Sequence, residues 1–157
     1  MEPTSPEIIR YRRAQFVTRL PVSYRYTAGH AWLAPQPDGR WRVGFTKFAT
    51  RMLGEIVDHA FQVEAGAPVQ VGQIVGWVEG FKAISDVYCV GAGRFLGANS
   101  QLKEQPDLVN QAPYGAGWLY ELEGAPDPKC VDAHGYREVL DRTIDQMRAR
   151  PTGAGHS

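Results

Sequence analysis

One lysine, Lys82, stands between two short runs of apolar residues whose composition is typical of β-strands. The runs cover residues 74–78 and 87–90, and Gly80 lies between them. Two such runs joined by a few residues that include a glycine predict a β-hairpin. Because a lysine at a hairpin tip is displayed to solvent and to modifying enzymes, the amine of Lys82 is a natural attachment point for a covalent group.

A modification motif surrounds this lysine. The chain resembles the H proteins of the glycine cleavage system, and lipoyl domains more broadly, which read Glu-Ser-apolar-Lys-Ala-x-Ser-Asp around their modified lysine. Five residues match that motif position for position: Glu79, Lys82, Ala83, Ser85 and Asp86. Biotin carriers instead place methionines beside the lysine, where this chain has Phe81 and Ala83. The resemblance therefore implies covalent lipoate on Lys82, with Glu79 and Asp86 as recognition groups for the modifying enzyme.

The lipoyl family also places a glycine at a turn on each side of the lysine, and Gly66 and Gly93 stand at those two offsets. A glycine fits where a turn needs positive φ or a close approach of the backbone. The alternative for Lys82 is a solvated turn lysine without function, in which case Glu79 and Asp86 are solvated carboxylates. The agreement on both sides of the lysine favours lipoylation.

Two further segments carry the resemblance to H proteins. Residues 26–32 resemble the opening Tyr-Thr-x-x-His-Glu-Trp of the family, with Ala31 in place of the acidic residue. Residues 110–118 resemble Asn-x-x-Pro-Tyr-Gly-x-Gly-Trp, a segment that lipoyl domains of 2-oxoacid dehydrogenases lack. The chain departs from the usual H-protein pattern at several positions, which are Ala31, Gly80, Phe81, Val90 and residues 58–62, a strand that the family fold places near the lysine hairpin.

The resemblance covers residues 26–145 and implies both a fold and a function. The implied fold is all-β, a barrel-sandwich hybrid of two antiparallel sheets with flanking helices and a C-terminal helix. The implied function is a carrier and not an enzyme, and no catalytic constellation stands out in the sequence. Such a carrier takes an aminomethyl group from glycine decarboxylase (P protein) to aminomethyltransferase (T protein), and dihydrolipoamide dehydrogenase (L protein) reoxidises its lipoyl group. A lipoate ligase or octanoyl transferase attaches that group first.

Three other functions are compatible with the same residues. The departures from the family pattern fit a lipoate-binding protein of another pathway, such as sulfur oxidation, or a relay that passes lipoyl groups to other enzymes. The third is an interaction module that keeps the fold and is never modified. A fold of this kind does not by itself choose among functions.

Local signals predict the elements that position the lysine. Residues 31–35 and 40–46 read as a hairpin around a Pro-Asp-Gly turn. Thr46 as N-cap and Gly54 at the far end predict a short helix through Leu53. Asp132 is a predicted N-cap of a C-terminal helix that packs one apolar stripe on the sheet. The residues of this stripe are Tyr136, Val139, Leu140, Ile144 and Met147.

The histidines and cysteines are expected to be structural. His30 is predicted to make structural hydrogen bonds, and Cys89 is predicted to be a small buried residue that faces the core. The alternative for Cys89 is a thiol that exchanges with the lipoyl dithiolane. The four histidines and two cysteines show no metal-ligand spacing, so no metal is expected.

Length and composition divide the chain of 157 residues. We expect a basic extension at residues 1–25, one lipoyl-carrier domain at 26–149 and a disordered tail at 150–157. The extension is expected to be solvated and partly ordered, with three apolar residues able to pin part of it to the body: Phe16, Val17 and Leu20. The alternative for this extension is a docking arm for an acidic partner.

Charge and apolar content exclude several classes of partner. The 17 basic and 17 acidic residues cancel, so no nucleic-acid partner is implied. No apolar run has the length that crosses a membrane, and the first ten residues do not resemble a secretory signal. Two cysteines do not make a disulfide framework, so we expect a reducing compartment, the cytoplasm.

Overall fold

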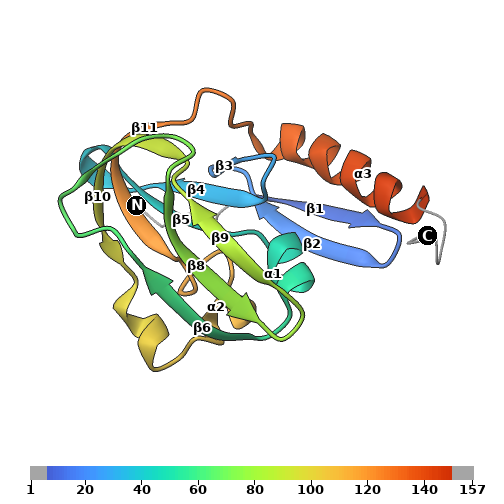
Figure 1. Cartoon of the computed structure of the whole chain (residues 1–157). Coiled ribbons are helices and arrows are strands. Elements are labelled where there is room, and N and C mark those ends of the chain that lie inside the picture. Colours follow the sequence, from blue (N-terminus) through green and yellow to red (C-terminus); the bar gives the residue numbers. More distant parts are fainter. Residues whose placement is uncertain (1–6, 150–157) are drawn as a thin grey trace, which may run out of the picture.

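The computed structural model describes residues 7–149, which fold into antiparallel β-sheets flanked by helices (Figure 1). The strands are β1 Ile8–Arg13, β2 Phe16–Pro21, β3 Arg25–Tyr26, β4 Ala31–Pro35, β5 Arg40–Phe45, β6 Ile56–Phe61, β7 Pro68–Val69, β8 Ile74–Gly80, β9 Ile84–Tyr88, β10 Gly91–Ala98 and β11 Tyr120–Pro126. The helices are α1 Lys47–Leu53, α2 Leu108–Gln111 and α3 Ala133–Ala149, with short 3-10 helices η1 Pro37–Gly39 and η2 Ser100–Lys103. The predicted all-β fold with a C-terminal helix is confirmed.

The strands form three sheets. The largest has the order β3-β4-β5-β11-β10-β7, the second has the order β6-β8-β9, and the third is the β1-β2 hairpin. Figure 1 shows the second sheet in front of the largest one, while β1 and β2 extend to one side, alongside α3. The first two are the antiparallel sheets that the sequence predicted, and the third is an addition to them.

The main core lies between the two larger sheets. Its members, each at most 2% exposed, include Leu33, Val43, Val78, Val87, Phe95, Tyr120 and Leu122. The rings of Phe95 and Tyr120 stack with their centroids 5.6 Å apart. Side chains alternate between the two faces of a strand, so a slip of one residue in β8 or β9 would turn buried valines outward. This core therefore fixes the register of the strands that carry the lysine.

The local signals of the middle of the chain are confirmed. β4 and β5 pair as a hairpin, and Asp38 and Gly39 adopt the positive φ angles of 65° and 73° at its turn. The Thr46 hydroxyl caps α1 by accepting a hydrogen bond from the Ala49 N–H at 3.4 Å. Gly54 ends the helix with a φ of 78°.

The predicted extension contains an ordered hairpin. Residues 8–13 pair antiparallel with residues 16–21, and the inward-facing side chains share a core with α1 and α3. Phe16 and Leu20 are buried as expected, but Val17 is 40% exposed. The Phe16 ring meets the Phe48 ring of α1 edge-on at 5.4 Å. Residues 8–21 are thus pinned to the body by alternate residues of β2, because a strand presents every second side chain to one face.

Helix α3 begins at the predicted cap, where Asp132 Oδ1 accepts a hydrogen bond from the Gly135 N–H at 2.8 Å. Tyr136, Leu140 and Ile144 of its stripe are buried, whereas Met147 is 42% exposed. The helix packs on β3, an edge strand of the largest sheet, as the sequence predicted, and also on β1 of the N-terminal hairpin. Within residues 7–149, no helix is both long enough and apolar enough to cross a membrane. The predicted tail, residues 150–157, lies outside the described residues.

Candidate lysine attachment site

Lys82 occupies the tip of the β8-β9 hairpin. The two strands pair antiparallel from Ile74 and Tyr88 to Glu79 and Ile84, and the residues between them form the turn. Lys82 is exposed, and its neighbour Phe81 is 75% exposed. The hairpin lies where the sequence placed it, with the lysine at its end.

Backbone hydrogen bonds hold this tip against the end of α1. The Lys82 N–H donates to the Leu53 carbonyl at 2.9 Å, and the Phe81 N–H donates to the Glu55 carbonyl at 3.0 Å. Within the turn, the Gly80 N–H donates to the Ala83 carbonyl at 2.8 Å. The tip is therefore fixed independently of the side chains at its outer surface.

Two glycines allow this close approach. A Cβ atom on Gly80 would collide with the Leu53 carbonyl oxygen and lie 2.8 Å from its carbon. A Cβ atom on Gly54 would lie 3.0 Å from Cγ of Lys82. Gly80 is one of the departures from the family motif, and the contact with Leu53 gives the physical reason for a glycine there.

Asn110 stabilises the segment after α1 against which the tip packs. Its Oδ1 accepts a hydrogen bond from the Ile56 N–H at 2.9 Å, and its Nδ2 donates to the Gly54 carbonyl at 3.0 Å. The sequence marked this residue only as the start of the segment 110–118. The sequence signal that could have indicated this role is a side-chain amide, which both donates and accepts hydrogen bonds, at the start of a glycine-rich loop.

The amine of Lys82 opens onto a groove. It lies 3.4 Å from the Arg51 carbonyl oxygen, to which it donates, and the groove of about 360 Å³ is also lined by Lys47 and Glu55. A smaller recess of about 130 Å³ lies between β9 and the strands β4 and β5. Ser85 and Asp86 line it, and so does Ala31, where the family motif has a carboxylate. An exposed amine on a fixed tip, with open space beside it, fits a covalently attached arm.

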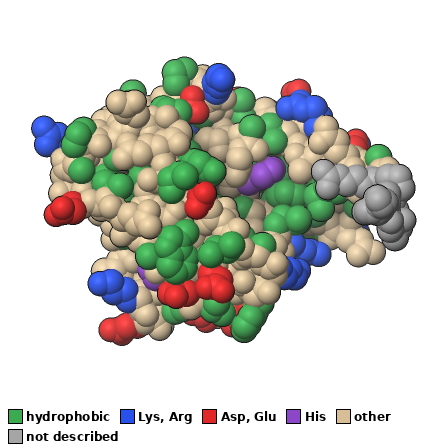
Figure 2. Space-filling model, viewed as in Figure 1, with side chains coloured by type: hydrophobic (Ala, Val, Ile, Leu, Met, Phe, Trp, Pro, Cys, Tyr) green, Lys and Arg blue, Asp and Glu red, His purple; other side chains and the backbone are tan. Residues whose placement is uncertain are grey.

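The outward face of the second sheet carries acids among apolar residues. Glu79 and Asp86, the predicted recognition groups, are both exposed. Asp86 lies opposite Trp77 of β8, and Glu79 stands two residues after Trp77 on the same strand, so these side chains share the outward face. Asp58 of β6 pairs with Glu79 on the same face. Ile84 is 64% exposed. Figure 2 shows acidic and hydrophobic side chains side by side over this part of the surface.

Comparison with known proteins identifies the family. A model of the glycine cleavage H-protein family matches residues 24–141. The H protein of Pseudoalteromonas atlantica is 34% identical over 128 residues, which are 80% of this chain and 98% of that protein. The H protein of Sodalis glossinidius is also 34% identical, with 97% of its length covered. This chain belongs to the glycine cleavage H-protein family.

A solved structure agrees with this assignment. The H protein of Mycobacterium marinum superposes with a TM-score of 0.70 at 33% identity, over 78% of this chain and 99% of that one. The relatives are thus covered almost completely, while part of this chain has no counterpart in them. The family match begins after β2, so the β1-β2 hairpin precedes the H-protein region.

The two turn glycines have different roles in this H-protein family member. Gly66 lies in a turn before β7 with a φ of 93°. Gly93 lies inside β10, opposite Gly124, where a Cβ atom would collide with the Glu123 carbonyl oxygen. The first meets the expectation of positive φ in a turn, and the second serves close approach of two strands.

His30 and Cys89 lie away from the tip. His30 Nδ1 lies 2.8 Å from the Tyr136 hydroxyl, and burial lowers the pKa of the imidazole to about 4. The Cys89 thiol is buried and donates to the Gly91 carbonyl at 3.1 Å, and burial raises its pKa. The placement of both residues agrees with the structural roles predicted for them.

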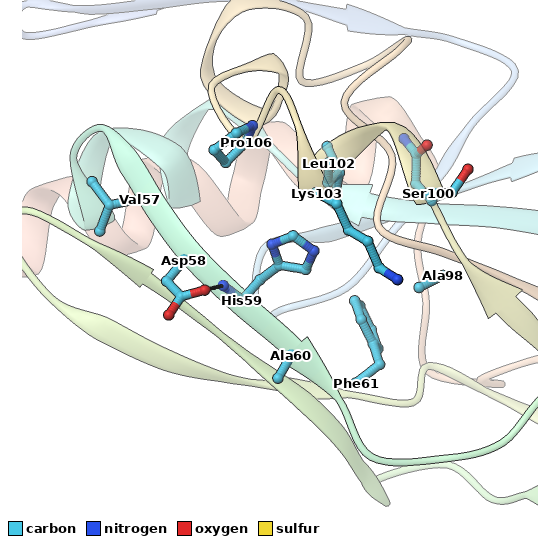
Figure 3. Close-up of a pocket in the computed structure, with 11 residues that line it drawn as sticks. Val57, Asp58, His59, Ala60, Phe61, Ala98, Ser100, Leu102, Lys103 and Pro106 are labelled. Atoms are coloured by element: carbon cyan, nitrogen blue, oxygen red, sulfur yellow. Dashed lines mark hydrogen bonds between the residues drawn. The ribbon is translucent and has the colours of Figure 1, made fainter.

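Of the divergent residues 58–62, residues 58–61 line a groove of about 630 Å³ between β6 and η2 (Figure 3). His59 and Lys103 border it from facing elements, β6 and η2. Burial lowers the pKa of His59. Lys82 does not line this groove, so these substitutions change a surface of the lysine-bearing sheet without touching the lysine.

Proposed function

We propose that this chain is a lipoyl carrier of glycine cleavage, which carries an aminomethyl group on lipoyl-Lys82 between glycine decarboxylase and aminomethyltransferase. The observation that carries the proposal is the exposed Lys82 amine on a tip fixed by three backbone hydrogen bonds. Membership of the H-protein family supports the same function.

The residues of this chain display and orient the group. Lipoate, when attached, supplies a disulfide that opens to accept a fragment and that thiol–disulfide chemistry restores. The Leu53 and Glu55 carbonyls hold the turn, so the arm leaves the protein from a fixed point. Tethering at that point keeps the cargo at high effective concentration near a partner's active site. Glu79 and Asp86 remain our candidates for recognition by the lipoate ligase or octanoyl transferase.

The partners follow from this role. Glycine decarboxylase, aminomethyltransferase and dihydrolipoamide dehydrogenase would each meet the tip of the β8-β9 hairpin, and the chain itself would be the non-catalytic subunit. The cysteines of the described residues are both free, which suits the predicted cytoplasmic location.

A lipoyl carrier of another pathway is the second candidate. Two observations favour it: Ala31 removes a carboxylate of the family motif from the recess beside β9, and residues 58–62 replace the usual strand sequence. Both changes lie beside the lysine-bearing sheet, the first next to β9 and the second on β6, where a different partner would dock.

Loading by glycine decarboxylase separates the two candidates. Fully lipoylated protein is incubated with glycine and glycine decarboxylase, and the mass of the Lys82 peptide is followed. We expect the peptide to gain the mass of methylamine, because one sulfur takes the aminomethyl group and the other takes a hydrogen while carbon dioxide leaves, with no gain in a Lys82→Arg control. A lipoylated peptide that never gains this mass would favour the second candidate.

A further inference from the structure

The outer face of the β1-β2 hairpin is basic. Arg10 and Arg12 of β1 and Arg19 of β2 are exposed, while the opposite face carries the buried Tyr11 and Phe16. Arg10 pairs directly with Arg19 across the strands. Like charges directly opposite each other destabilise a sheet, so this pair does not serve the stability of the hairpin.

These arginines also lack acidic partners among the described residues. Within residues 7–149, the cations in ion pairs are Arg13, Arg40 and Arg42. Arg13 is on the inner face, where it binds Asp145 at 2.8 Å and Asp141 at 3.3 Å. The hairpin thus neutralises the cation that faces α3, while no carboxylate within residues 7–149 pairs with its outer cations.

Two adjoining grooves lead from this hairpin to Lys82. The first, of about 330 Å³, is lined by Arg19 and Lys47, and the second is the groove beside the Lys82 amine. Both grooves share Lys47 and Asn110. Together they present four cations, Arg19, Lys47, Arg51 and Lys82, and one carboxylate, that of Glu55. We call these two grooves the basic channel.

Arg51 lies between Lys82 and the N-terminal hairpin. Its carbonyl accepts the hydrogen bond of the Lys82 amine, and its guanidinium lies 5.9 Å from the centre of the Phe16 ring on β2. One residue of α1 therefore separates the lysine from the hairpin. Figure 1 shows α1 between the tip of β8-β9 and the β1-β2 hairpin.

We propose that the basic channel docks an acidic segment of the enzyme that attaches lipoate to Lys82. The inference rests on the proposed function. Among the partners, this enzyme alone must reach Nζ itself, which lies in the channel, whereas the others meet the far end of the arm. In its reaction the neutral amine attacks an activated lipoyl carboxyl group, the amide forms, and the proton and the activating group leave. Amide formation removes the Lys82 charge, which weakens the channel's hold on an acidic segment and favours release.

A protein partner fits better than a nucleic acid or a membrane. Asp58, Glu79 and Asp86 lie exposed on the neighbouring face of the lysine-bearing sheet, and they would repel an extended polyanion. A protein surface can place its own carboxylates against the channel alone.

The test reverses two charges that are not needed for folding. The variant Arg19→Glu/Lys47→Glu places one carboxylate opposite Arg10 and another in the first turn of α1, where negative charge is favourable. The control Lys103→Glu/Lys129→Glu makes the same change of net charge at two exposed residues that line neither groove of the basic channel. Unfolding midpoints are measured for both variants.

The readout is the initial rate at which the lipoate-attaching enzyme, purified from the same cells, modifies Lys82, followed by peptide mass. We expect a rate about tenfold lower for the test variant, an unchanged rate for the control, and a smaller difference at high salt. Equal rates for the wild type and a folded test variant would overturn the inference, as would equal slowing by the control. Binding of DNA or anionic vesicles through Arg19 and Lys47, without an effect on this rate, would overturn it in favour of a polyanion. A wild-type lysine that the enzyme never modifies would remove the proposed function itself.

Discussion

The two hairpins on either side of α1 are attached to the protein in different ways. The β8-β9 hairpin belongs to a three-stranded sheet, and the backbone carbonyls of Leu53 and Glu55 hold its tip. The β1-β2 hairpin is a sheet of its own, held mainly by side chains of its inner face. Backbone attachment leaves the outer side chains of the lysine hairpin free to serve recognition. Side-chain attachment makes the N-terminal hairpin depend on a few buried groups.

The largest expected effect tests how the N-terminal hairpin is attached. Phe16→Ala removes the ring that meets Phe48, and we expect a loss of about 4 kcal/mol in the free energy of unfolding. Val17→Ala, at a half-exposed position of the same strand, serves as the control and should change little. In hydrogen exchange, the amides of β1 and β2 should lose protection while those of β8 and β9 keep theirs. Equal loss in both hairpins would contradict the difference in attachment.

A pH dependence is expected from the core that the N-terminal hairpin shares with α3. His30 lies against Tyr136 there, and its pKa is about 4 in the fold against 6.5 when unfolded. The folded state disfavours the protonated imidazole. The contribution of His30 to the free energy of unfolding is therefore complete above pH 6.5 and is lost as the pH falls from 6.5 to 4. The loss amounts to about 3 kcal/mol at most.

Urea unfolding at several pH values measures this loss. His30→Asn removes the titration and tolerates the φ of 72° at this position. The variant should show a flatter dependence of stability on pH over that interval. An unchanged slope would mean that another group is responsible.

A third effect tests the backbone attachment of the lysine tip. Gly80→Ala places a methyl group against the Leu53 carbonyl, which must displace the turn, and we expect a loss of about 2 kcal/mol together with slower modification of Lys82. Gly115→Ala is the matched control, because a Cβ atom there meets nothing within 4 Å. Normal stability and modification of Gly80→Ala would show that the tip does not need this contact.

The smallest effect concerns the exposed ion pair of the N-terminal hairpin. Asp145→Asn removes the partner of Arg13, whose hydrogen bond lowers the pKa of the Asp145 carboxyl. Since both groups are exposed, we expect no measurable change in the unfolding midpoint at neutral pH. A clear drop would show that the hairpin depends on charge as well as on its buried aromatic residues.

The sequence predicted those elements whose signals are local. Thr46 and Gly54 bound α1, Asp132 caps α3, and the runs around Lys82 form its hairpin, since caps and strand periodicity act within a few residues. The role of Asn110 was not predicted, because its partners Gly54 and Ile56 are more than fifty residues away in the chain. Contacts of that range leave no periodic trace in a single sequence.

The N-terminal hairpin shows a second limit. Its inner face mixes Tyr11, Phe16 and Leu20 with the polar Arg13 and Thr18, so the apolar alternation is interrupted. The arginines made the segment look solvated, and only the complementary surface of α3 reveals which face is buried. The position of Gly93 inside a strand was not predicted either, because a glycine is as typical of a turn as of a close contact between two strands.

The most direct test of the central claim is the mass of the Lys82 peptide from protein isolated from its own cells. The account predicts one added lipoyl group on Lys82. An unmodified lysine, in cells whose other lipoyl proteins are modified, would contradict it and would favour an unmodified interaction module.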